Sequence, residues 1–241
     1  MKKITNHVAE SGEMFQNQPK SKGLFITATG TDVGKTFATG LIVQKLRQAG
    51  CRAGYYKAAL SGAQSIAQSD AGYVNRFADI GQPEETLVSY WYRNAVSPHL
   101  AAKLEGNPVE LSQIVKDYQA VQEQYEYVTV EGSGGIVCPI RWDDKEHLLL
   151  EDIIKTLNLP TVVVADAGLG AINGTVLTVE YLRRCKISIK GVVLNRYTGG
   201  RLQEDNVRMI EEIGRVPVIA CIPPGEKELQ MDVHQLKALY E

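Results

Sequence analysis

The sequence predicts an α/β fold, a single three-layer domain built on a mostly parallel sheet. Short, continuous apolar runs rich in valine and isoleucine have the pattern of strands that helices cover on both faces. Longer amphipathic stretches alternate with these runs, as helices do in right-handed crossover connections. No internal repeat, low-complexity tract or linker divides the chain, so we expect one domain.

The elements follow from these patterns in chain order. The expected strands are Leu24–Ala28, Ala53–Tyr56, Tyr127–Glu131, Thr161–Ala165, Gly191–Asn195 and Val218–Ile222. The expected helices are Thr36–Ala49, Leu111–Tyr125, Asn173–Arg184 and Gln203–Ile213, each with apolar residues at helical spacing. The first helix stops at Gly50, a residue suited to a helix C-terminus. Residues 1–22 are polar and aperiodic, so we expect a flexible N-terminal extension before a domain over residues 23–241.

Composition and charge exclude several classes of protein. The 241 residues are 44% hydrophobic and 22% charged, with a net charge of −2, so the basic excess typical of nucleic-acid binding is missing. The longest apolar run, Thr161–Ala165, is far too short to cross a bilayer, and no apolar signal region follows Lys2 and Lys3. The four scattered cysteines favour reduced thiols over a metal site or disulfides. We expect a cytoplasmic protein that binds neither nucleic acid nor membranes.

A phosphate-binding loop follows the first expected strand. Residues Phe25–Thr36 run from a strand through a tight turn into a helix, and they end in a Gly-Lys-Thr triplet. Backbone N–H groups of such a loop and the helix N-terminus favour phosphate. Lys35 can contact phosphate oxygens, and the Thr36 hydroxyl can enter the coordination shell of Mg²⁺. The usual pattern has glycine at position 29, where this chain has Thr29 followed by Gly30. The motif predicts a nucleotide site like that of P-loop NTPases.

Three carboxylates and a second lysine are candidates for the same edge of the sheet. Glu131 ends a strand, where parallel sheets bind ligands, although a surface acid before a turn is the alternative. Asp166 is a rival metal ligand or a helix cap, and Asp70 is a helix N-cap or a metal ligand. Lys57 follows the strand Ala53–Tyr56, where its ammonium could stabilise a developing phosphate or remain a solvated lysine.

These residues, taken in this order, resemble the dethiobiotin synthetase family. The resemblance covers about Gly23 to Pro224. It rests on TGTDVGKT at 29–36, YKxxxSG at 56–62, Ser69-Asp70, Ser97-Pro98-His99, VEGxGG at 130–135 and Asn195. The phosphate loop alone is widespread, whereas the ordered combination is far more specific. The family tolerates threonine at the position of the missing glycine.

The resemblance implies an ATP-dependent cyclo-ligase that acts in the penultimate step of biotin biosynthesis. Such enzymes use ATP, Mg²⁺ and CO₂ to close a ureido ring on 7,8-diaminopelargonic acid, giving dethiobiotin, ADP and phosphate. A carbamate forms first, becomes a carbamic–phosphoric anhydride, and is then attacked by the second amine. The resemblance also implies a homodimer with the active site near the subunit interface.

By position, the resemblance gives roles to individual residues. Lys57 and Lys35 are the implied catalytic residues, and Thr36, Asp70 and Glu131 the implied Mg²⁺ ligands. The implied nucleotide-binding residues are Gly30, Thr31, Asp32, Val33, Gly34, Lys35, Thr36, Phe37, Asp70, Glu131, Gly132, Ser133, Gly134, Asn195, Arg196, Ile222, Pro223 and Pro224. Among these, Asn195 would read adenine. The implied substrate-binding residues are Asp32, Lys57, Ser61, Ala171, Ile172 and Asn173.

The chain departs from the family pattern at three places. Ala58 follows Lys57 where the family commonly has proline, Ser133 replaces alanine, and Asp166 stands where a small or uncharged residue is usual. None of the three removes a charge or ligand that the reaction needs.

Three other classes are alternatives. A ParA/MinD-like switch ATPase would carry a second lysine at the position of Gly30. A cobyrinic-acid amidating enzyme would need a glutaminase domain, for which the residues after Pro224 are too few. The third is a P-loop NTPase of unassigned substrate.

Overall fold

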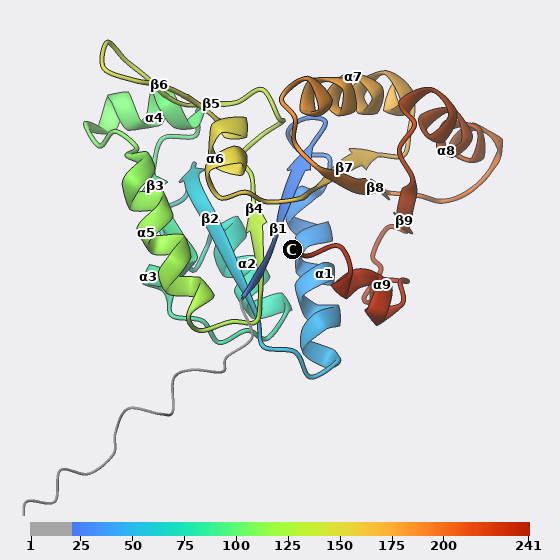
Figure 1. Cartoon of the computed structure of the whole chain (residues 1–241), viewed down its shortest axis with the longest axis horizontal. Helices are drawn as coiled ribbons and strands as arrows, with labels where there is room; N and C mark the ends of the chain where they lie inside the picture. Colours follow the sequence, from blue (N-terminus) through green and yellow to red (C-terminus); the bar gives the residue numbers. More distant parts are fainter. Residues whose placement is uncertain (1–20) are drawn as a thin grey trace, which may run out of the picture.

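A computed structural model describes residues 21–241 of the chain. The expected extension over residues 1–22 therefore lies outside the described residues, except for its last two positions. Within the described part, seven parallel strands form one sheet in the order β3-β2-β4-β1-β7-β8-β9 (Figure 1). These strands are β1 (Lys22–Ala28), β2 (Ala53–Ser61), β3 (Val88–Tyr92), β4 (Tyr127–Glu131), β7 (Thr161–Asp166), β8 (Ile189–Asn195) and β9 (Val218–Ile222).

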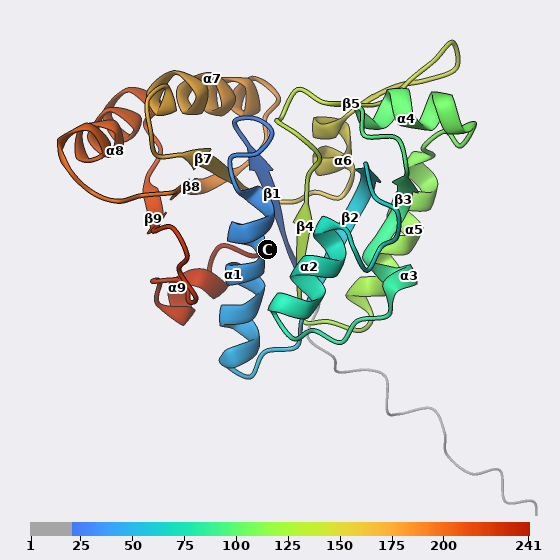
Figure 2. The same ribbon diagram turned by 180° about the vertical axis from the view of Figure 1, so that it is seen from behind.

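Helices cover both faces of this sheet, as Figures 1 and 2 show from opposite sides. The helices are α1 (Lys35–Gln48), α2 (Asp70–Phe77), α3 (Glu84–Leu87), α4 (Pro98–Glu105), α5 (Leu111–Gln122), α6 (Leu150–Thr156), α7 (Ala171–Arg184), α8 (Arg201–Gly214) and α9 (Val233–Lys237). Helices α1, α2 and α9 share one hydrophobic core with the sheet, while α5, α6, α7 and α8 share the other. The predicted three-layer α/β fold is confirmed.

The central strand β1 explains why the sheet is so apolar. Phe25 packs into the core under α5 to α8, whereas Leu24 and Ile26 pack into the core under α1. Because both faces of the strand are covered, alternation of polar and apolar residues is lost and a continuous apolar run remains. No helix within residues 21–241 is long and apolar enough to span a bilayer.

Several elements differ from the sequence-based expectation. Strand β2 was expected to end at Tyr56, but it continues through Lys57 to Ser61. The residue beside Lys57 in the neighbouring strand β4 is Glu131, so an opposite charge accompanies the lysine into the sheet. Strand β3 was not expected, and neither was the antiparallel hairpin of β5 (Pro139–Trp142) and β6 (His147–Leu149). These short segments lie outside the apolar pattern of the central strands.

Strand β1 lies at the point where the strand order reverses. On one side of β1 lie β4, β2 and β3, and on the other side lie β7, β8 and β9. In open parallel sheets, ligands bind beyond the carboxyl ends of the strands at such a switch point. The loop that follows β1 is the predicted phosphate loop, so fold and motif indicate the same place.

Candidate active site

The loop between β1 and α1 has the backbone conformation that a phosphate-binding turn requires. Gly34 precedes the first helical residue and has φ 91°, while Asp32 has φ 60°. A side chain at position 34 would collide with Asn195, since its Cβ would lie 1.9 Å from Asn195 Nδ2. Asn195 Nδ2 also donates a hydrogen bond to Val33 O at 3.0 Å. Glycine is therefore required at position 34 by both its φ angle and the close approach of Asn195.

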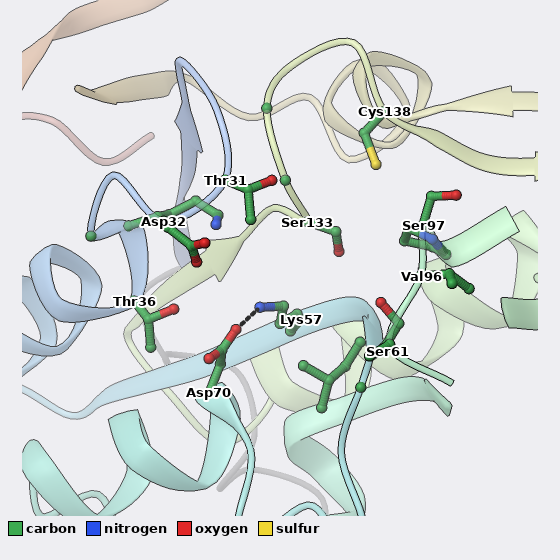
Figure 3. A pocket seen from close by; sticks show the side chains of 18 of the residues that line it. Thr31, Asp32, Thr36, Lys57, Ser61, Asp70, Val96, Ser97, Ser133 and Cys138 are labelled. Carbon is green, nitrogen blue, oxygen red and sulfur yellow. Dashed lines mark hydrogen bonds and ion pairs between the residues drawn. The ribbon is translucent and has the colours of Figure 1, made fainter. Parts of the chain in front are cut away.

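The carboxylate of Glu131 joins the phosphate loop to two lysines. Its Oε1 accepts a hydrogen bond from Thr36 Oγ1 at 2.8 Å and one from Lys57 Nζ at 3.0 Å. Lys35 Nζ lies 3.8 Å from the same oxygen. Lys57 Nζ also donates to Asp70 Oδ2 at 2.9 Å, the contact drawn in Figure 3. Thus α1, β2, β4 and α2 each contribute to one charged cluster at the switch point.

Burial determines how these charges behave. The side chains of Lys57 and Glu131 are 3% and 0% exposed, whereas that of Asp70 is 49% exposed. Burial alone would lower the pKa of Lys57, but the carboxylates of Glu131 and Asp70 overcome it and raise that pKa. Lys57 in turn lowers the pKa of Asp70. For Lys35, burial is the larger influence and its pKa is lowered, although Glu131 opposes the shift. The two carboxylates therefore favour the charged form of Lys57 inside the protein.

Four members of the cluster, Lys35, Thr36, Lys57 and Asp70, line a cleft of about 950 Å³, and Glu131 lies buried behind them. Figure 3 shows Thr31 and Asp32 of the phosphate loop on one side of it, and Ser61, Val96 and Ser97 on the other. Of the predicted site residues, the cleft is lined by Thr31, Asp32, Gly34, Lys35, Thr36, Phe37, Lys57, Ser61, Asp70, Ser133, Gly134 and Arg196. This volume is within the range of small-molecule sites.

The oxygen donors of the cleft fit a magnesium ion. Thr36, Asp70 and Glu131 offer a hydroxyl and two carboxylates, the hard ligands that Mg²⁺ prefers. Within residues 21–241, no group of three or more His, Cys, Asp and Glu side chains could hold a metal by itself. The hydroxyl of Thr36 and the two carboxylates of Asp70 and Glu131 suit Mg²⁺, because this ion is usually bound by one or two carboxylates together with substrate phosphates.

The structure resolves the alternatives that the residues left open for the acids. Ser69 is the N-cap of α2, and Asp70 is the first helical residue, so its carboxylate is free to pair with Lys57. Glu131 is buried and not a surface acid. Asp166 lies away from the cluster: its Oδ2 is 2.5 Å from Arg196 Nη1, and its Oδ1 accepts from Gly168 N at 2.8 Å. The N-cap of α7 is Gly170, so Asp166 does not cap that helix.

Other predicted site residues lie around the cleft without lining it. Asn195 is buried beneath the phosphate loop beside Ile222 of β9, and the amide that would read adenine is bonded to Val33 O. Pro223 and Pro224 are exposed directly after β9. The predicted residues that do not line the cleft are Gly30, Val33, Glu131, Gly132, Ala171, Ile172, Asn173, Asn195, Ile222, Pro223 and Pro224. Residues 171–173 form the first turn of α7, on the other side of β1 from β2.

Ser133 and Arg196 brace the cleft. Ser133 Oγ donates to Ala59 O at 2.5 Å, which ties the glycine-rich turn after β4 to β2. Arg196 Nη2 donates to Asp32 O at 2.6 Å and holds the phosphate loop from the end of β8. The serine that departs from the family pattern therefore has a structural partner.

Several cleft residues were missed by sequence reasoning. Val96, Pro98, Val137, Cys138 and Pro139 line the wall opposite the phosphate loop. The Ser-Pro-His motif at 97–99 was the only signal for this wall, because the other residues lie in loops without periodicity. Burial raises the pKa of the Cys138 thiol to about 11, so it lines the wall as a protonated, weakly polar group.

Comparisons with known proteins show the family to which the chain belongs. Residues 22–230 match the protein family described as an AAA domain. The ATP-dependent dethiobiotin synthetase BioD of Brachyspira hyodysenteriae is 47% identical over 222 residues, which cover 92% of this chain and 100% of that protein. A protein of the same name from Clostridium botulinum is 46% identical over 227 residues, covering 92% of this chain and 99% of that protein.

Solved structures with similar folds include a bacterial cell division protein complex and a chloroplast FtsY. The MinC:MinD cell division protein complex of Aquifex aeolicus matches with a TM-score of 0.53 and 15% identity, over 91% of this chain and 86% of that chain. Chloroplast FtsY from Physcomitrella patens matches with a TM-score of 0.52 and 17% identity, over 92% of this chain and 66% of that chain. At such identities the likeness shows the fold alone.

The family follows from the curated relatives rather than from these structural neighbours. Their identity extends over more than nine-tenths of the chain and over their own full length. On this evidence the chain belongs to the ATP-dependent dethiobiotin synthetase family.

Proposed function

We propose that this protein converts 7,8-diaminopelargonic acid, CO₂ and ATP into dethiobiotin, ADP and phosphate. The observation that carries the proposal is the convergence of Lys35 and Lys57 on one oxygen of Glu131, inside the cleft that follows the phosphate loop. Two cations beside a P-loop suit a reaction in which a carboxylate-like nucleophile attacks a phosphate, because both reactants are anions.

Membership of the family supports the coarser part of this proposal directly. The chain is an ATP-dependent ligase that forms carbon–nitrogen bonds, with a role in biotin biosynthesis. The identity of the reaction steps, the metal and the residues that act is the part we infer.

The ring closes in three chemical steps. One amine of the substrate attacks CO₂, a nitrogen–carbon bond forms and the nitrogen loses a proton, giving a carbamate. A carbamate oxygen attacks the γ-phosphorus, and the bond from that phosphorus to the ADP oxygen breaks. The second amine attacks the carbamoyl carbon, phosphate leaves with its oxygen, and loss of a second proton completes the ureido ring.

The residues of the cleft have distinct parts in this scheme. Lys57 holds the carbamate and the transferring phosphoryl group, because its ammonium is fixed by Glu131 and Asp70 before substrate arrives. Lys35 contacts the phosphate oxygens from the start of α1. Ser61 touches the substrate from the end of β2, and Asp32 faces its amines. Mg²⁺ held by Thr36, Asp70 and Glu131 would neutralise charge on the phosphates.

We also infer a second subunit at the site. The α7 N-terminus of one protomer, at Ala171, Ile172 and Asn173, would bind the carboxylate of the substrate held in the cleft of its partner. Backbone N–H groups at a helix N-terminus favour such an anion. Asn195 and the segment Ile222–Pro224 would form the adenine pocket beside the phosphate loop.

Phosphate release from ATP tests the proposal. With Mg²⁺ present, release is expected only when both diaminopelargonic acid and bicarbonate are supplied, and omission of either one should abolish it. Mass spectrometry should detect dethiobiotin in amounts equal to the phosphate released. Turnover that ignores the diamine would contradict the synthetase assignment and would favour a switch ATPase.

A further inference from the structure

The carboxylate of Glu131 divides its two oxygens between the cleft and the interior. Oε1 contacts Thr36, Lys57 and Lys35, three residues that line the cleft. Oε2 points into the core, and among residues 21–241 its hydrogen-bond donor is the hydroxyl of Tyr55, at 3.1 Å. The orientation of this carboxylate is therefore fixed by Tyr55 on the core side as well as by Thr36 and the two lysines on the cleft side.

Tyr55 is built to hold one position. It is fully buried in β2, in the core shared with α1. Its backbone N–H donates to Gln82 Oε1 at 3.1 Å, and its carbonyl accepts from Gln82 Nε2 at 2.9 Å. Gln82 is itself buried and exchanges hydrogen bonds with Asn75 of α2, the helix that begins at Asp70. The main chain beneath the hydroxyl is thus fixed on the side away from β4.

The hydroxyl also stays a hydrogen-bond donor. It lies in the core, 3.1 Å from Oε2 of Glu131, and Tyr55 as a whole is fully buried. A neutral phenol donates its single proton, and the carboxylate is the acceptor that it meets. Without that donor, Oε2 would be a buried charged oxygen with no partner, and the carboxylate would be free to turn about its side chain.

We propose that the Tyr55 hydroxyl positions Glu131 so that Oε1 stays directed at the metal and phosphate site. This inference rests on the proposed role of Glu131 as a Mg²⁺ ligand. Tyr55 touches neither nucleotide nor metal, so it acts only through the carboxylate. The consequence is that loss of the hydroxyl weakens Mg²⁺ binding while the phosphate loop remains intact.

Tyr56 offers a matched control in the same strand. It is equally buried, but it faces the other core, and its hydroxyl contacts Ser89 Oγ at 2.6 Å and Ile114 O at 3.2 Å. Tyr56→Phe therefore removes a buried hydroxyl one residue away without touching Glu131. The two variants share any general cost of losing a hydrogen bond in β2.

The test is a Mg²⁺ titration of nucleotide binding, which needs no turnover. Binding of a fluorescent ADP analogue is followed as MgCl₂ is added to the wild type, Tyr55→Phe, Tyr56→Phe and Glu131→Gln. For Tyr55→Phe the Mg²⁺ midpoint should rise about 10- to 150-fold, the effect of losing one hydrogen bond to a charged group. Tyr56→Phe should keep the wild-type midpoint, and binding measured without Mg²⁺ should be the same in both tyrosine variants. In the Glu131→Gln background, Tyr55→Phe should add nothing further.

The outcomes separate the two claims. A raised midpoint in Glu131→Gln with an unchanged one in folded Tyr55→Phe would overturn this inference alone, even if the melting temperature of Tyr55→Phe falls. An unchanged midpoint in Glu131→Gln would overturn the metal role of Glu131 and this inference with it. Should Tyr55→Phe not fold, Gln82→Ala replaces it, because this change loosens the main chain of Tyr55 and keeps its hydroxyl. A smaller rise of the midpoint is then expected, and no rise overturns the inference.

Discussion

Lys57 illustrates how single residues at this site depend on one another. An isolated ammonium in the middle of a buried strand would be severely destabilising, yet Lys57 is accommodated because Glu131 is its register neighbour and Asp70 reaches it from α2. The same arrangement that satisfies the charge also holds it at the floor of the cleft, so its structural and chemical roles coincide.

Replacing Lys57 should separate chemistry from nucleotide binding. Lys57→Ala should lower diamine-dependent phosphate release by about 10²–10³-fold, since it removes the cation beside the transferring phosphate. Affinity for ADP should be nearly unchanged, because Lys35 and the loop remain. The buried Glu131 loses its partner, so the free energy of unfolding should fall by about 3 kcal/mol in chemical denaturation.

Lys155→Ala is the control for this variant, because its ammonium is on the surface of α6 and its one ion-pair partner within residues 21–241 is Asp152, at 3.6 Å. It should match the wild type in both assays. Loss of ADP affinity in Lys57→Ala would place that lysine in nucleotide binding instead.

The two glycines of the phosphate loop should respond differently to a methyl group. Gly34→Ala puts a Cβ at φ 91° and 1.9 Å from Asn195, so both strain and a clash are expected. The free energy of unfolding should fall by about 1–3 kcal/mol, with a matching loss of nucleotide affinity. At Gly30 nothing lies within 4 Å of an added Cβ, so Gly30→Ala should keep the wild-type melting temperature. Equal melting temperatures for the two variants would contradict this account.

Among the elements, the hairpin of β5 and β6 depends on one buried arginine. Arg141 Nη1 contacts Val109 O, Glu110 Oε1 and Glu146 Oε2, and its Nε lies 2.7 Å from Asp143 Oδ2. These contacts join the hairpin to the segment before α5. The hairpin begins at Pro139, which lines the cleft, so this cluster supports the wall opposite the phosphate loop.

The contribution of Asp143 to stability should depend on pH. Hydrogen bonds from Arg141 and from backbone N–H groups hold the pKa of Asp143 at about 2, below its ordinary 3.8. A carboxyl with a lowered pKa stabilises the fold above its unfolded-state pKa, and that contribution is lost as pH falls through the folded-state value. The melting temperature of the wild type should therefore exceed that of Asp143→Asn above about pH 4, and the difference should close toward pH 2.

Asp144→Asn tests whether this effect is specific. Asp144 is next in sequence, and within the described residues it forms no ion pair with Arg141. Its substitution should leave the melting temperature close to that of the wild type at each pH. A constant difference between the wild type and Asp143→Asn from pH 2 to pH 7 would contradict the proposed linkage.

At the scale of the whole molecule, large apolar side chains are exposed on both sides of the cleft. Leu169 is 93% exposed just before α7, and Val137 and Trp142 are 62% and 51% exposed beside the hairpin. Figure 1 shows α7 and the hairpin at the same end of the molecule, on either side of the loop after β1. Exposed apolar surface beside a site is typical of an interface, which supports the proposed homodimer.

Sedimentation analysis tests the dimer. The wild type should sediment as a dimer, and Leu169→Asp should raise the dissociation constant about 100-fold, the effect of a charge at the centre of an interface. In Leu169→Asp, diamine-dependent phosphate release should fall together with the fraction of protein that is dimeric. Ile213→Asp alters an exposed residue in the last turn of α8 and should leave the dimer intact. A monomeric wild type would contradict the two-subunit site.

Local patterns in the sequence were enough to predict the fold class, six of the seven strands of the main sheet, the phosphate loop and the carboxylate at the end of β4. Each of these is encoded within a few neighbouring residues, as a run of apolar side chains or a glycine-rich turn. Strand β3 and the hairpin were missed because short strands at the edges do not repeat the apolar pattern of the centre.

The contacts that build the site were decided only by the tertiary structure. Thr36, Lys57 and Tyr55 meet Glu131 across 95, 74 and 76 residues of chain because the sheet places β2, β4 and β1 side by side. The same order separates Asp166 from them, since β7 lies beyond β1. The sequence by itself thus determined which elements and which reactive residues this protein has. Which of those residues touch depends on strand order and register, and these are set by packing between distant segments rather than by any local pattern.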